Sequence, residues 1–197
     1  MRRKILFLIG LTLAGASLRA QELLDTKRKF YVNQTEFGIL AGRVKYPNLY
    51  NGNQEQVDNK FSLTVQTFNG IQIDERFATG ITVGMDWYKA ALLNPVAVGF
   101  RYNLTKKSPV KLFATADVGY GFTWFHDDSE GFDTKGGLMI NPGLGLKYGR
   151  KNGAAFTIAM TYKRQEARVN KPVLWDQTER SEERIYNRLA LRLGMSF

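Results

Sequence analysis

Along eight separate segments of this chain, apolar residues alternate with small or polar residues. A period of two places successive side chains on opposite faces of a β-strand, so each segment has one apolar face. Each segment is also long enough to cross a bilayer at a tilt, which takes roughly 9–11 residues of strand. The alternation therefore predicts an all-β chain with strands at approximately 35–45, 60–73, 76–88, 95–104, 110–125, 136–149, 153–168 and 184–197.

The segment 110–125 shows the pattern most clearly. One face carries the residues Leu112, Ala114, Ala116, Val118, Tyr120, Phe122 and Trp124. The other face carries Lys111, Phe113, Thr115, Asp117, Gly119, Gly121 and Thr123. In the segment 60–73 the alternation slips near Gln66 and Phe68, and we expect a β-bulge there.

The connections between these segments differ in length in a regular way. Short ones lie at 74–75, 105–109 and 149–153, longer ones at 46–59, 126–135 and 169–183, and 89–94 is intermediate. Short turns at one end and long loops at the other are typical of transmembrane β-barrels with an even number of strands. We therefore predict an eight-stranded antiparallel up-and-down transmembrane β-barrel, with both chain ends on the side of the short turns.

A secreted soluble barrel around a ligand is the alternative fold. Such a barrel carries large apolar residues inside and a densely charged coat outside. Here the less apolar face is mostly glycine, alanine, threonine and asparagine with scattered charges. That face suits a narrow lumen filled by side chains, so the pattern favours the transmembrane barrel.

The N-terminus has the layout of a signal peptide. Met1–Lys4 is basic, and Ile5–Ala16 is an apolar stretch that is too short to span a bilayer as a helix. Cleavage is predicted after Ala20, and Ala16 is the alternative site. The predicted organisation is a signal peptide at 1–20, a short periplasmic segment at 21–34 and the barrel at 35–197.

The formal charge of +10 does not require a nucleic-acid partner. Removal of residues 1–20 takes away four bases and no acid, so the net charge falls to +6; the bases are Arg2, Arg3, Lys4 and Arg19. Because the chain has no cysteine, neither a disulfide nor a thiolate metal site is expected. What remains is a modestly basic exported protein, and we expect no nucleic-acid partner.

Aromatic residues collect near both ends of the predicted strands. In the topology above, one group lies toward the outer interface of the membrane, namely Trp87, Trp124 and Tyr162. A second group lies near the periplasmic interface and includes Tyr102, Tyr148 and Phe197. Amphipathic rings prefer the boundary between membrane and water, so we interpret these groups as two aromatic girdles.

The end of the chain is the most regular strand. Its apolar face is unbroken and ends on a terminal aromatic residue: Leu189, Leu191, Leu193, Met195 and Phe197. This segment resembles the C-terminal targeting strand of outer-membrane proteins, which the barrel-assembly machinery recognises in that family. The resemblance implies that this strand is an assembly signal and that the machinery is a partner during biogenesis.

The mature chain as a whole is similar to small eight-stranded outer-membrane β-barrel proteins. These are the OmpA-like and OmpX-like proteins and the related barrel family common in Bacteroidetes. The resemblance implies a location in the outer membrane of a Gram-negative envelope, in contact with outer-membrane lipid and lipopolysaccharide. Nothing follows the last strand, so the peptidoglycan-binding domain of longer OmpA proteins is expected to be absent, and attachment to the cell wall is not implied.

Several charged residues fall on the inward face of the predicted strands. They are Glu36, Asp86, Arg101, Asp117, Lys147, Lys163, Arg184, Arg188 and Arg192. Counting along the strands places Asp86, Asp117 and Arg188 at similar heights near mid-barrel. Charges in a narrow lumen must pair or hold water, so we predict a plug of ion pairs. The alternative is a narrow channel, and the excess of bases would make it favour anions.

His126 is the only histidine and stands next to Asp127, Asp128 and Ser129. Outer-membrane lipid A deacylases use a histidine, a serine and a carboxylate, which invites comparison. Ser129 lies in a predicted loop, however, and we expect no enzyme, no catalytic residue and no cofactor. The acidic residues Asp127, Asp128, Glu130 and Asp133 offer oxygen ligands to a divalent cation, but a solvated loop without metal is the expected state.

The hairpin at 164–183 is charged and longer than a membrane crossing requires, with Trp175 near its tip. We expect it to project from the membrane as a sheet edge that can recruit a protein partner by strand addition. The sequence thus predicts a non-enzymatic outer-membrane barrel with a structural or surface-interaction role. The alternatives are a narrow channel or transport-associated barrel and, third, a lipid A-modifying enzyme.

Overall fold

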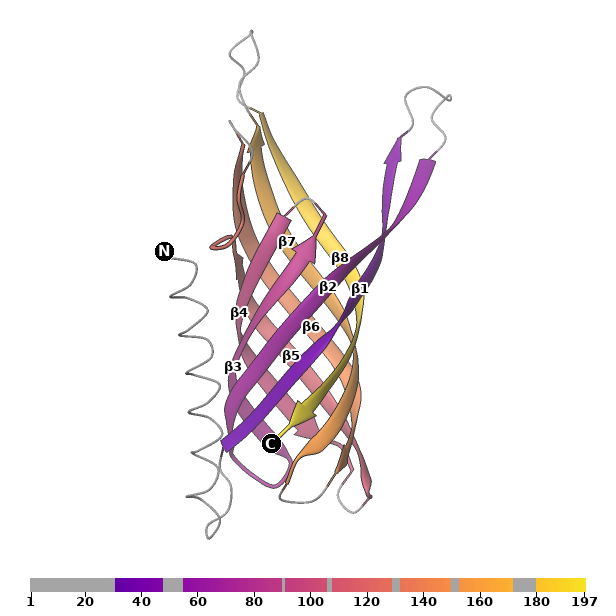
Figure 1. Ribbon diagram of the computed structural model, residues 1–197, viewed down its shortest axis with the longest axis vertical. Helices are drawn as coiled ribbons and strands as arrows, with labels where there is room; N and C mark the ends of the chain where they lie inside the picture. Colours follow the sequence, from indigo (N-terminus) through magenta and orange to yellow (C-terminus); the bar gives the residue numbers. More distant parts are fainter. Residues whose placement is uncertain are drawn as a thin grey trace, which may run out of the picture. The chain divides into compact units, whose positions relative to one another are not determined.

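The computed structural model describes residues 31–47, 55–89, 91–105, 108–128, 132–149, 153–171 and 180–197. The predicted signal peptide lies outside this set. Eight strands form a closed antiparallel barrel in which each strand pairs with its neighbours in the sequence and β1 pairs with β8 (Figure 1). The strands are β1 (Tyr31–Pro47), β2 (Glu55–Gln72), β3 (Phe77–Tyr88), β4 (Ala91–Asn103), β5 (Val110–Phe122), β6 (Asp133–Gly149), β7 (Ala155–Lys171) and β8 (Arg180–Ser196). The predicted fold class is therefore confirmed.

The eight predicted strands are all present, and several are longer than expected. β1 and β2 remain paired as far as Pro47 and Glu55, and β7 and β8 as far as Lys171 and Arg180. The expected long loops at 46–59 and 169–183 are therefore partly strand. Their remaining residues, including Trp175, lie outside the described part of the chain.

The expected intermediate connection at 89–94 is wrong, because β4 already begins at Ala91. The sequence misled here because Pro95 reads as a strand boundary. In the structure Pro95 stays within β4, and the β3–β4 ladder is interrupted between the pairs Val83–Val96 and Asp86–Leu93. Proline has no N–H to donate to a ladder, so β4 continues through Pro95 although its pairing with β3 is interrupted there.

The expected bulge near Gln66 and Phe68 is also wrong, since β2 keeps an unbroken register with both of its neighbours. What changes there is the polarity of the two faces. Phe68 points into the barrel and is fully buried, and the Arg101 guanidinium lies 4.4 Å from its ring centroid. Thr67 and Asn69 point outward and hydrogen-bond to Asn33. The register irregularity of the barrel lies instead in β6, between Gly136 and Met139.

The barrel closes along β1 and β8, whose ladder runs from the pair Gln34–Ser196 to the pair Ala41–Leu189. Beyond that point the described part of β1 pairs only with β2, and β8 only with β7. Figure 1 shows the β1–β2 hairpin diverging from the β7–β8 hairpin at the end away from the C-terminus. The closing ladder is thus shorter than the hairpins that flank it.

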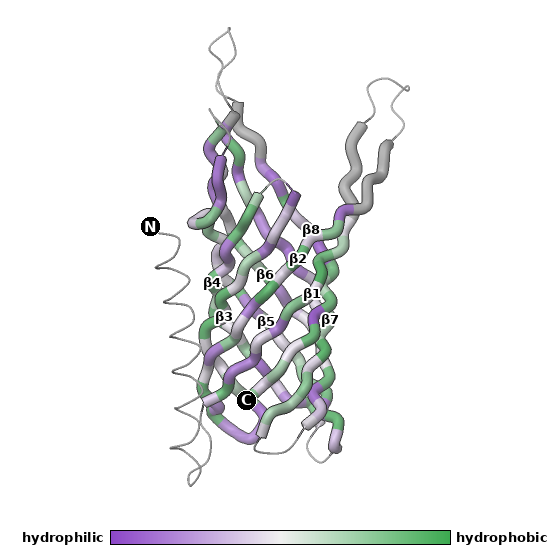
Figure 2. The backbone as a smooth tube through the Cα atoms, in the orientation of Figure 1, coloured by the Kyte–Doolittle hydropathy of each residue, from purple (hydrophilic) through white to green (hydrophobic). Residues whose placement is uncertain are grey.

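The two faces of the wall differ in polarity, as the alternating colours along the strands in Figure 2 indicate. In β8, Leu189, Leu191 and Leu193 are exposed on the outside, while Arg188 and Arg192 are buried inside. No helix among the described residues is long and apolar enough to span a bilayer. An apolar exterior around a polar, filled interior is the construction of a membrane-spanning barrel, because the outer face meets lipid.

Candidate functional site

The nine charged residues predicted for the lumen alternate with the exposed residues of their strands. Seven are almost fully buried, and Lys147 and Arg184 are half-buried. The seven are Glu36, Asp86, Arg101, Asp117, Lys163, Arg188 and Arg192. Period two fixes this orientation once the register of each strand is set, so the structure brings the predicted charges into one interior.

Asp117 is the centre of the best-connected group. Its carboxylate accepts hydrogen bonds from the Arg101 guanidinium at 2.8 Å and from the Thr82 hydroxyl at 2.7 Å. Its second oxygen accepts from the Asn141 amide at 3.0 Å. All four side chains are buried, so this charge is satisfied within the protein, as a buried carboxylate must be.

The same group continues to the other side of the lumen. The Thr161 hydroxyl donates to Asn141 Oδ1 at 2.6 Å, and Arg192 Nη1 donates to Thr161 Oγ1 at 2.9 Å. Arg192 fits because Gly38 faces it, and a Cβ there would lie 2.8 Å from Arg192 Cγ. Side chains from β4, β5, β6, β7 and β8 thus join into one bonded chain across the lumen.

Asp86 forms a second buried ion pair, with Lys163 Nζ at 2.5 Å, and accepts from the Thr64 hydroxyl at 2.7 Å. The expected grouping of Asp86, Asp117 and Arg188 by height therefore does not describe the contacts. Counting residues from strand ends ignores the stagger between neighbouring strands that closing a barrel requires. As a result Asp86 pairs with Lys163. Asp117 pairs with Arg101, which residue counting places closer to the periplasmic end than Asp117.

Glu36 is held by two neutral amides. Gln34 Nε2 donates to one carboxylate oxygen at 2.7 Å, and Gln66 Nε2 donates to the other at 2.9 Å. The sequence reasoning named charges and missed these neutral partners, along with Thr64, Thr82, Asn141 and Thr161. A signal was available, because all of them occupy inward positions of the same alternating pattern.

Arg188 lies in a different environment, near the outer end of the lumen. Its guanidinium carbon is 5.8 Å from the centroid of the Tyr186 ring, and that ring stacks on Tyr88 at 4.3 Å. Around these rings lies an apolar cluster, which consists of Leu40, Tyr88, Ala91, Leu93, Ala167 and Ala190. The lumen thus contains a polar layer and an apolar layer.

Lys147 takes no part in either layer among the contacts of the described residues. Its Nζ donates to Ser196 Oγ at 2.7 Å, next to the C-terminus. Ser196 is itself fully buried. Lys147 therefore binds the end of the last strand near the periplasmic mouth of the barrel.

The aromatic residues predicted for the two girdles lie on the outer face of the wall. Those predicted for the outer interface, Trp87, Trp124 and Tyr162, are exposed, and Tyr162 donates to Asn187 at 2.9 Å. Those predicted for the periplasmic interface are exposed as well, namely Tyr102, Tyr148 and Phe197. The predicted assembly signal forms one outward stripe along β8 and the residue that follows it, namely Leu189, Leu191, Leu193, Met195 and Phe197.

His126 has a position that suits a structural brace. Its Nδ1 accepts a hydrogen bond from the Leu92 N–H at 3.2 Å, and its Nε2 lies 3.3 Å from Asp128 Oδ1. β5 ends at Phe122, so His126 replaces the missing ladder partner of β4 at this height. Both ring nitrogens are occupied by these contacts, and Ser129 lies outside the described residues.

Asp128 is tied to the start of β6. Both the N–H and the hydroxyl of Thr134 donate to its carboxylate. Burial acts to raise the pKa of Asp128, but the Thr134 hydrogen bonds and the nearby His126 outweigh it, and the pKa lies below the usual value of 3.8. Within the described ranges, no three residues of the histidine, cysteine, aspartate and glutamate types come together as metal ligands.

Comparison with known proteins gives matches in structure only. No protein-family model matches the chain, and no curated protein matches it. The N-terminal β-barrel domain of Pseudomonas aeruginosa OprF aligns over 87% of this chain and 98% of its own, at 11% sequence identity and a TM-score of 0.51. The outer membrane protein AlkL, determined in DMPC lipid bilayers, aligns over 85% and 88%, at 15% identity and a TM-score of 0.53.

At these identities the likeness concerns the fold alone. That fold is the small outer-membrane β-barrel which the alternation and the last strand predicted, and this expectation is confirmed. The exterior of this chain carries the apolar side chains that such a barrel presents to lipid. The chain therefore has the fold of the small eight-stranded outer-membrane β-barrels.

Proposed function

We propose that this protein is a non-enzymatic outer-membrane barrel with a closed lumen, whose role is structural or lies in contacts made at its outer surface. The observation that carries the proposal is the bonded chain from Arg101 to Arg192, which connects five of the eight strands through buried side chains. Removing one partner of a buried ion pair is strongly unfavourable. The network therefore resists the separation of side chains that a water-filled path would need.

The apolar cluster near the outer end supports the same proposal. Leu40 and Leu93 are fully buried members of this cluster, which also contains Tyr88, and Tyr186 stacks on Tyr88. Ions cross apolar constrictions poorly because the constriction excludes water. An ion would have to pass this layer as well as the polar network, so we expect no stable open state.

Conductance in planar bilayers tests the closed lumen. The wild-type barrel should give no stable conductance, and the Asp117→Ala, Arg192→Ala double variant should give more frequent openings because two members of the bonded chain are lost. A stable wild-type conductance that disappears on substitution of Arg188 or Arg192 would contradict the plug. It would favour the narrow channel, whose excess of bases would select anions.

The β7–β8 hairpin is the surface we propose for contact with a protein partner. Its described outer part carries exposed ion pairs, including Arg168–Glu183 at 2.7 Å and Arg164–Glu166 at 3.0 Å. At residues 183–186 the ladder of β8 runs with β7 and not with β1. An extended segment of another protein can add to a sheet at such an edge.

Amide hydrogen exchange tests this surface. The N–H groups of residues 183–186 that point away from β7 should exchange more slowly in native outer-membrane vesicles than in the purified barrel in lipid. The backbone N–H of Phe156, at the other end of the barrel, provides the control, because its exchange rate should be the same in both preparations. Equal rates in both preparations would contradict a partner at this edge.

A further inference from the structure

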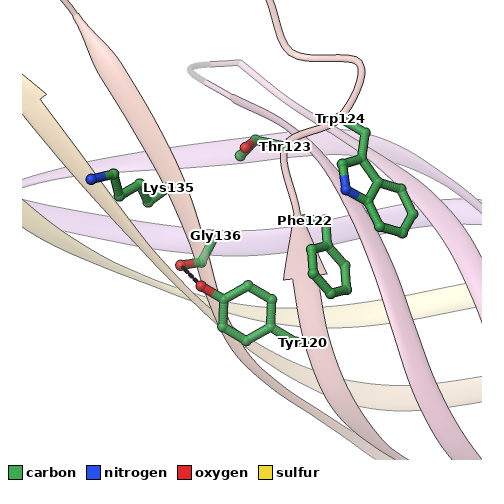
Figure 3. A pocket seen from close by; sticks show the side chains of 6 residues that line it. All are labelled: Tyr120, Phe122, Thr123, Trp124, Lys135 and Gly136. Atoms are coloured by element: carbon green, nitrogen blue, oxygen red, sulfur yellow. Dashed lines mark hydrogen bonds between the residues drawn. The ribbon is translucent and has the colours of Figure 1, made fainter.

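A groove lies on the outside of the barrel, where β5 and β6 reach their outer ends. It has a volume of about 540 Å³ and is lined by Tyr120, Phe122, Thr123, Trp124, Lys135 and Gly136. Figure 3 shows the three aromatic rings along one side of this groove, with Lys135 on the other. Tyr120, Trp124 and Lys135 are exposed on the outer face of the wall, so the groove opens toward lipid.

The aromatic wall of the groove is held in place by its own contacts. Tyr120 and Phe122 have ring centroids 5.0 Å apart, and Phe122 stacks on Trp124 at 4.4 Å. The Tyr120 hydroxyl donates to the Gly136 carbonyl at 2.7 Å, the bond drawn in Figure 3. The three rings are therefore ordered before any ligand arrives, which lowers the entropic cost of binding.

The floor of the groove depends on Gly136. A Cβ at this position would lie 1.5 Å from the carbonyl oxygen of Gly121, so no side chain can be placed there without moving the backbone of β5. Gly136 also begins the register irregularity of β6. The strand thus passes under the Tyr120 ring without filling the space beside it.

The chemistry of the groove is apolar along its length and cationic at its rim. The Lys135 side chain is 61% exposed, and among the described residues it makes a loose ion pair with Asp133 at 3.3 Å. Exposed pairs of this kind contribute little, so the ammonium can exchange Asp133 for a better anion. Arg168, the ladder partner of Lys135 on β7, is already paired with Glu183 at 2.7 Å, so Lys135 is the cation assigned to the ligand.

The height of the groove indicates the occupant. Trp124 and Lys135 stand near the outer ends of their strands, and the outward residues below them, Val118 and Leu138, are exposed and apolar. A ligand must therefore carry an anionic group at the water interface and an apolar chain that enters the bilayer. The outer leaflet of an outer membrane is built from an acylated, phosphorylated glycolipid that meets both requirements.

We propose that this groove binds one acyl chain of a lipid A-type phosphoglycolipid, with a phosphate of its headgroup on Lys135. The aromatic wall contacts the chain, and the ammonium donates to the phosphate oxygens. The site requires only that the barrel lies in the outer membrane. It is independent of whether the lumen conducts and of any partner at the β7–β8 hairpin.

Native mass spectrometry of the purified barrel in detergent tests the site, with diphosphoryl lipid A as the probe. Lys135→Gln should weaken lipid A retention roughly tenfold, the size expected for one charge-assisted hydrogen bond. Tyr120→Ala should weaken it through loss of the wall, and Lys135→Arg should retain it. The matched controls are Lys89→Gln, an exposed lysine at the same end of the barrel, and Tyr162→Ala, an outer-girdle tyrosine outside the groove.

Two further probes separate the sources of the signal. Dephosphorylated lipid A should bind the wild type as weakly as diphosphoryl lipid A binds Lys135→Gln, and phosphatidylglycerol should bind less well than lipid A. Equal lipid A retention by wild type and Lys135→Gln would overturn the site, and so would equal retention of phosphatidylglycerol. Heat-dependent gel mobility of every variant shows whether the barrel is folded, so a loss of binding is not mistaken for misfolding.

Discussion

Replacing Asp117 with alanine should lower the free energy of unfolding of the barrel by about 3–5 kcal/mol, the usual cost of removing one partner from a buried ion pair. The carboxylate is fully buried and accepts from Arg101, Thr82 and Asn141. Without it the buried Arg101 side chain remains in the lumen with no other carboxylate of the described residues within salt-bridge distance. Most of the loss is therefore the cost of an unpaired charge.

A second substitution, at Arg101, separates the cost of the unpaired charge from the rest of the loss. Arg101→Met in the Asp117→Ala background should recover most of the lost free energy, because two neutral side chains can replace a buried ion pair at little cost. The recovery should be about 2–3 kcal/mol, the part of the loss that comes from the unpaired charge. An exposed pair provides the control, and Glu183→Ala, which removes the Arg168 contact, should cost less than about 1 kcal/mol.

Urea unfolding of barrels refolded in lipid vesicles gives the free energy of unfolding, with gel mobility and tryptophan emission as independent signals. The four proteins compared are the wild type, Asp117→Ala, the Asp117→Ala, Arg101→Met double variant and Glu183→Ala. A loss below about 1 kcal/mol for Asp117→Ala would show that water already satisfies Arg101 and that the lumen is hydrated. A double variant that is no more stable than Asp117→Ala would refute the explanation by an unpaired charge.

Three further predictions concern the strand ends and the outer loop. Deletion of Phe197 should reduce the amount of assembled barrel in the outer membrane severalfold, while Phe156→Ala, another exposed aromatic at the same interface, should leave it unchanged in quantitative blots of membrane fractions. His126→Ala should lower the free energy of unfolding by about 1–3 kcal/mol because the Leu92 N–H loses its acceptor, while lipid A mass spectra stay identical to wild type; altered spectra would favour an enzyme. Because the folded pKa of Asp128 lies below its usual 3.8, its contribution to stability is complete above that pH and is lost as the pH falls through the folded pKa. The protection of the Thr134 amide, which is its exchange rate relative to that of an unstructured amide at the same pH, should therefore fall at low pH, and Asp128→Asn should remove that pH dependence.

Much of the wall was predictable from the sequence because a period of two is a direct consequence of strand geometry. Once lipid was assumed to lie outside the barrel, the apolar faces of the segments 112–124 and 189–197 could only point outward. The inward charges followed from the same rule. Residues at positions of opposite parity, such as Arg192 and Leu193, could not share a face in any register.

The contacts inside the lumen were harder to predict, because they depend on neighbouring strands and not on one strand alone. Asp86 meets Lys163 only because the stagger of the closed sheet brings β3 and β7 to the same height. Neutral residues such as Gln66 and Asn141 carry no charge signal, although each binds a carboxylate. In β2 the apolar Phe68 points inward and the polar Asn69 points outward, which is the reverse of the usual polarity of the two faces. The sequence pattern at this point therefore resembles that of a bulge, although the register is unbroken.

The groove at β5 and β6 escaped sequence reasoning for a related reason. Tyr120 and Trp124 were recognised as lipid-facing aromatic residues, but the space between them and Lys135 exists because Gly136 lies against Gly121 on the neighbouring strand. A close approach between two backbones leaves no mark on the alternation of either strand. It can be found only after the register is known.

The short ladder between β1 and β8 has a consequence for the order in which the barrel forms and opens. Its residues are the most distant in the sequence, so bringing them together has the largest loop-closure cost of any strand pair. It also has fewer ladder positions than the hairpin β7–β8, which extends from Ala155 to Lys171. Closure along Gln34–Ala41 should therefore be the last step of assembly and the first to be undone, so that a barrel under load opens as a curved sheet before any hairpin separates.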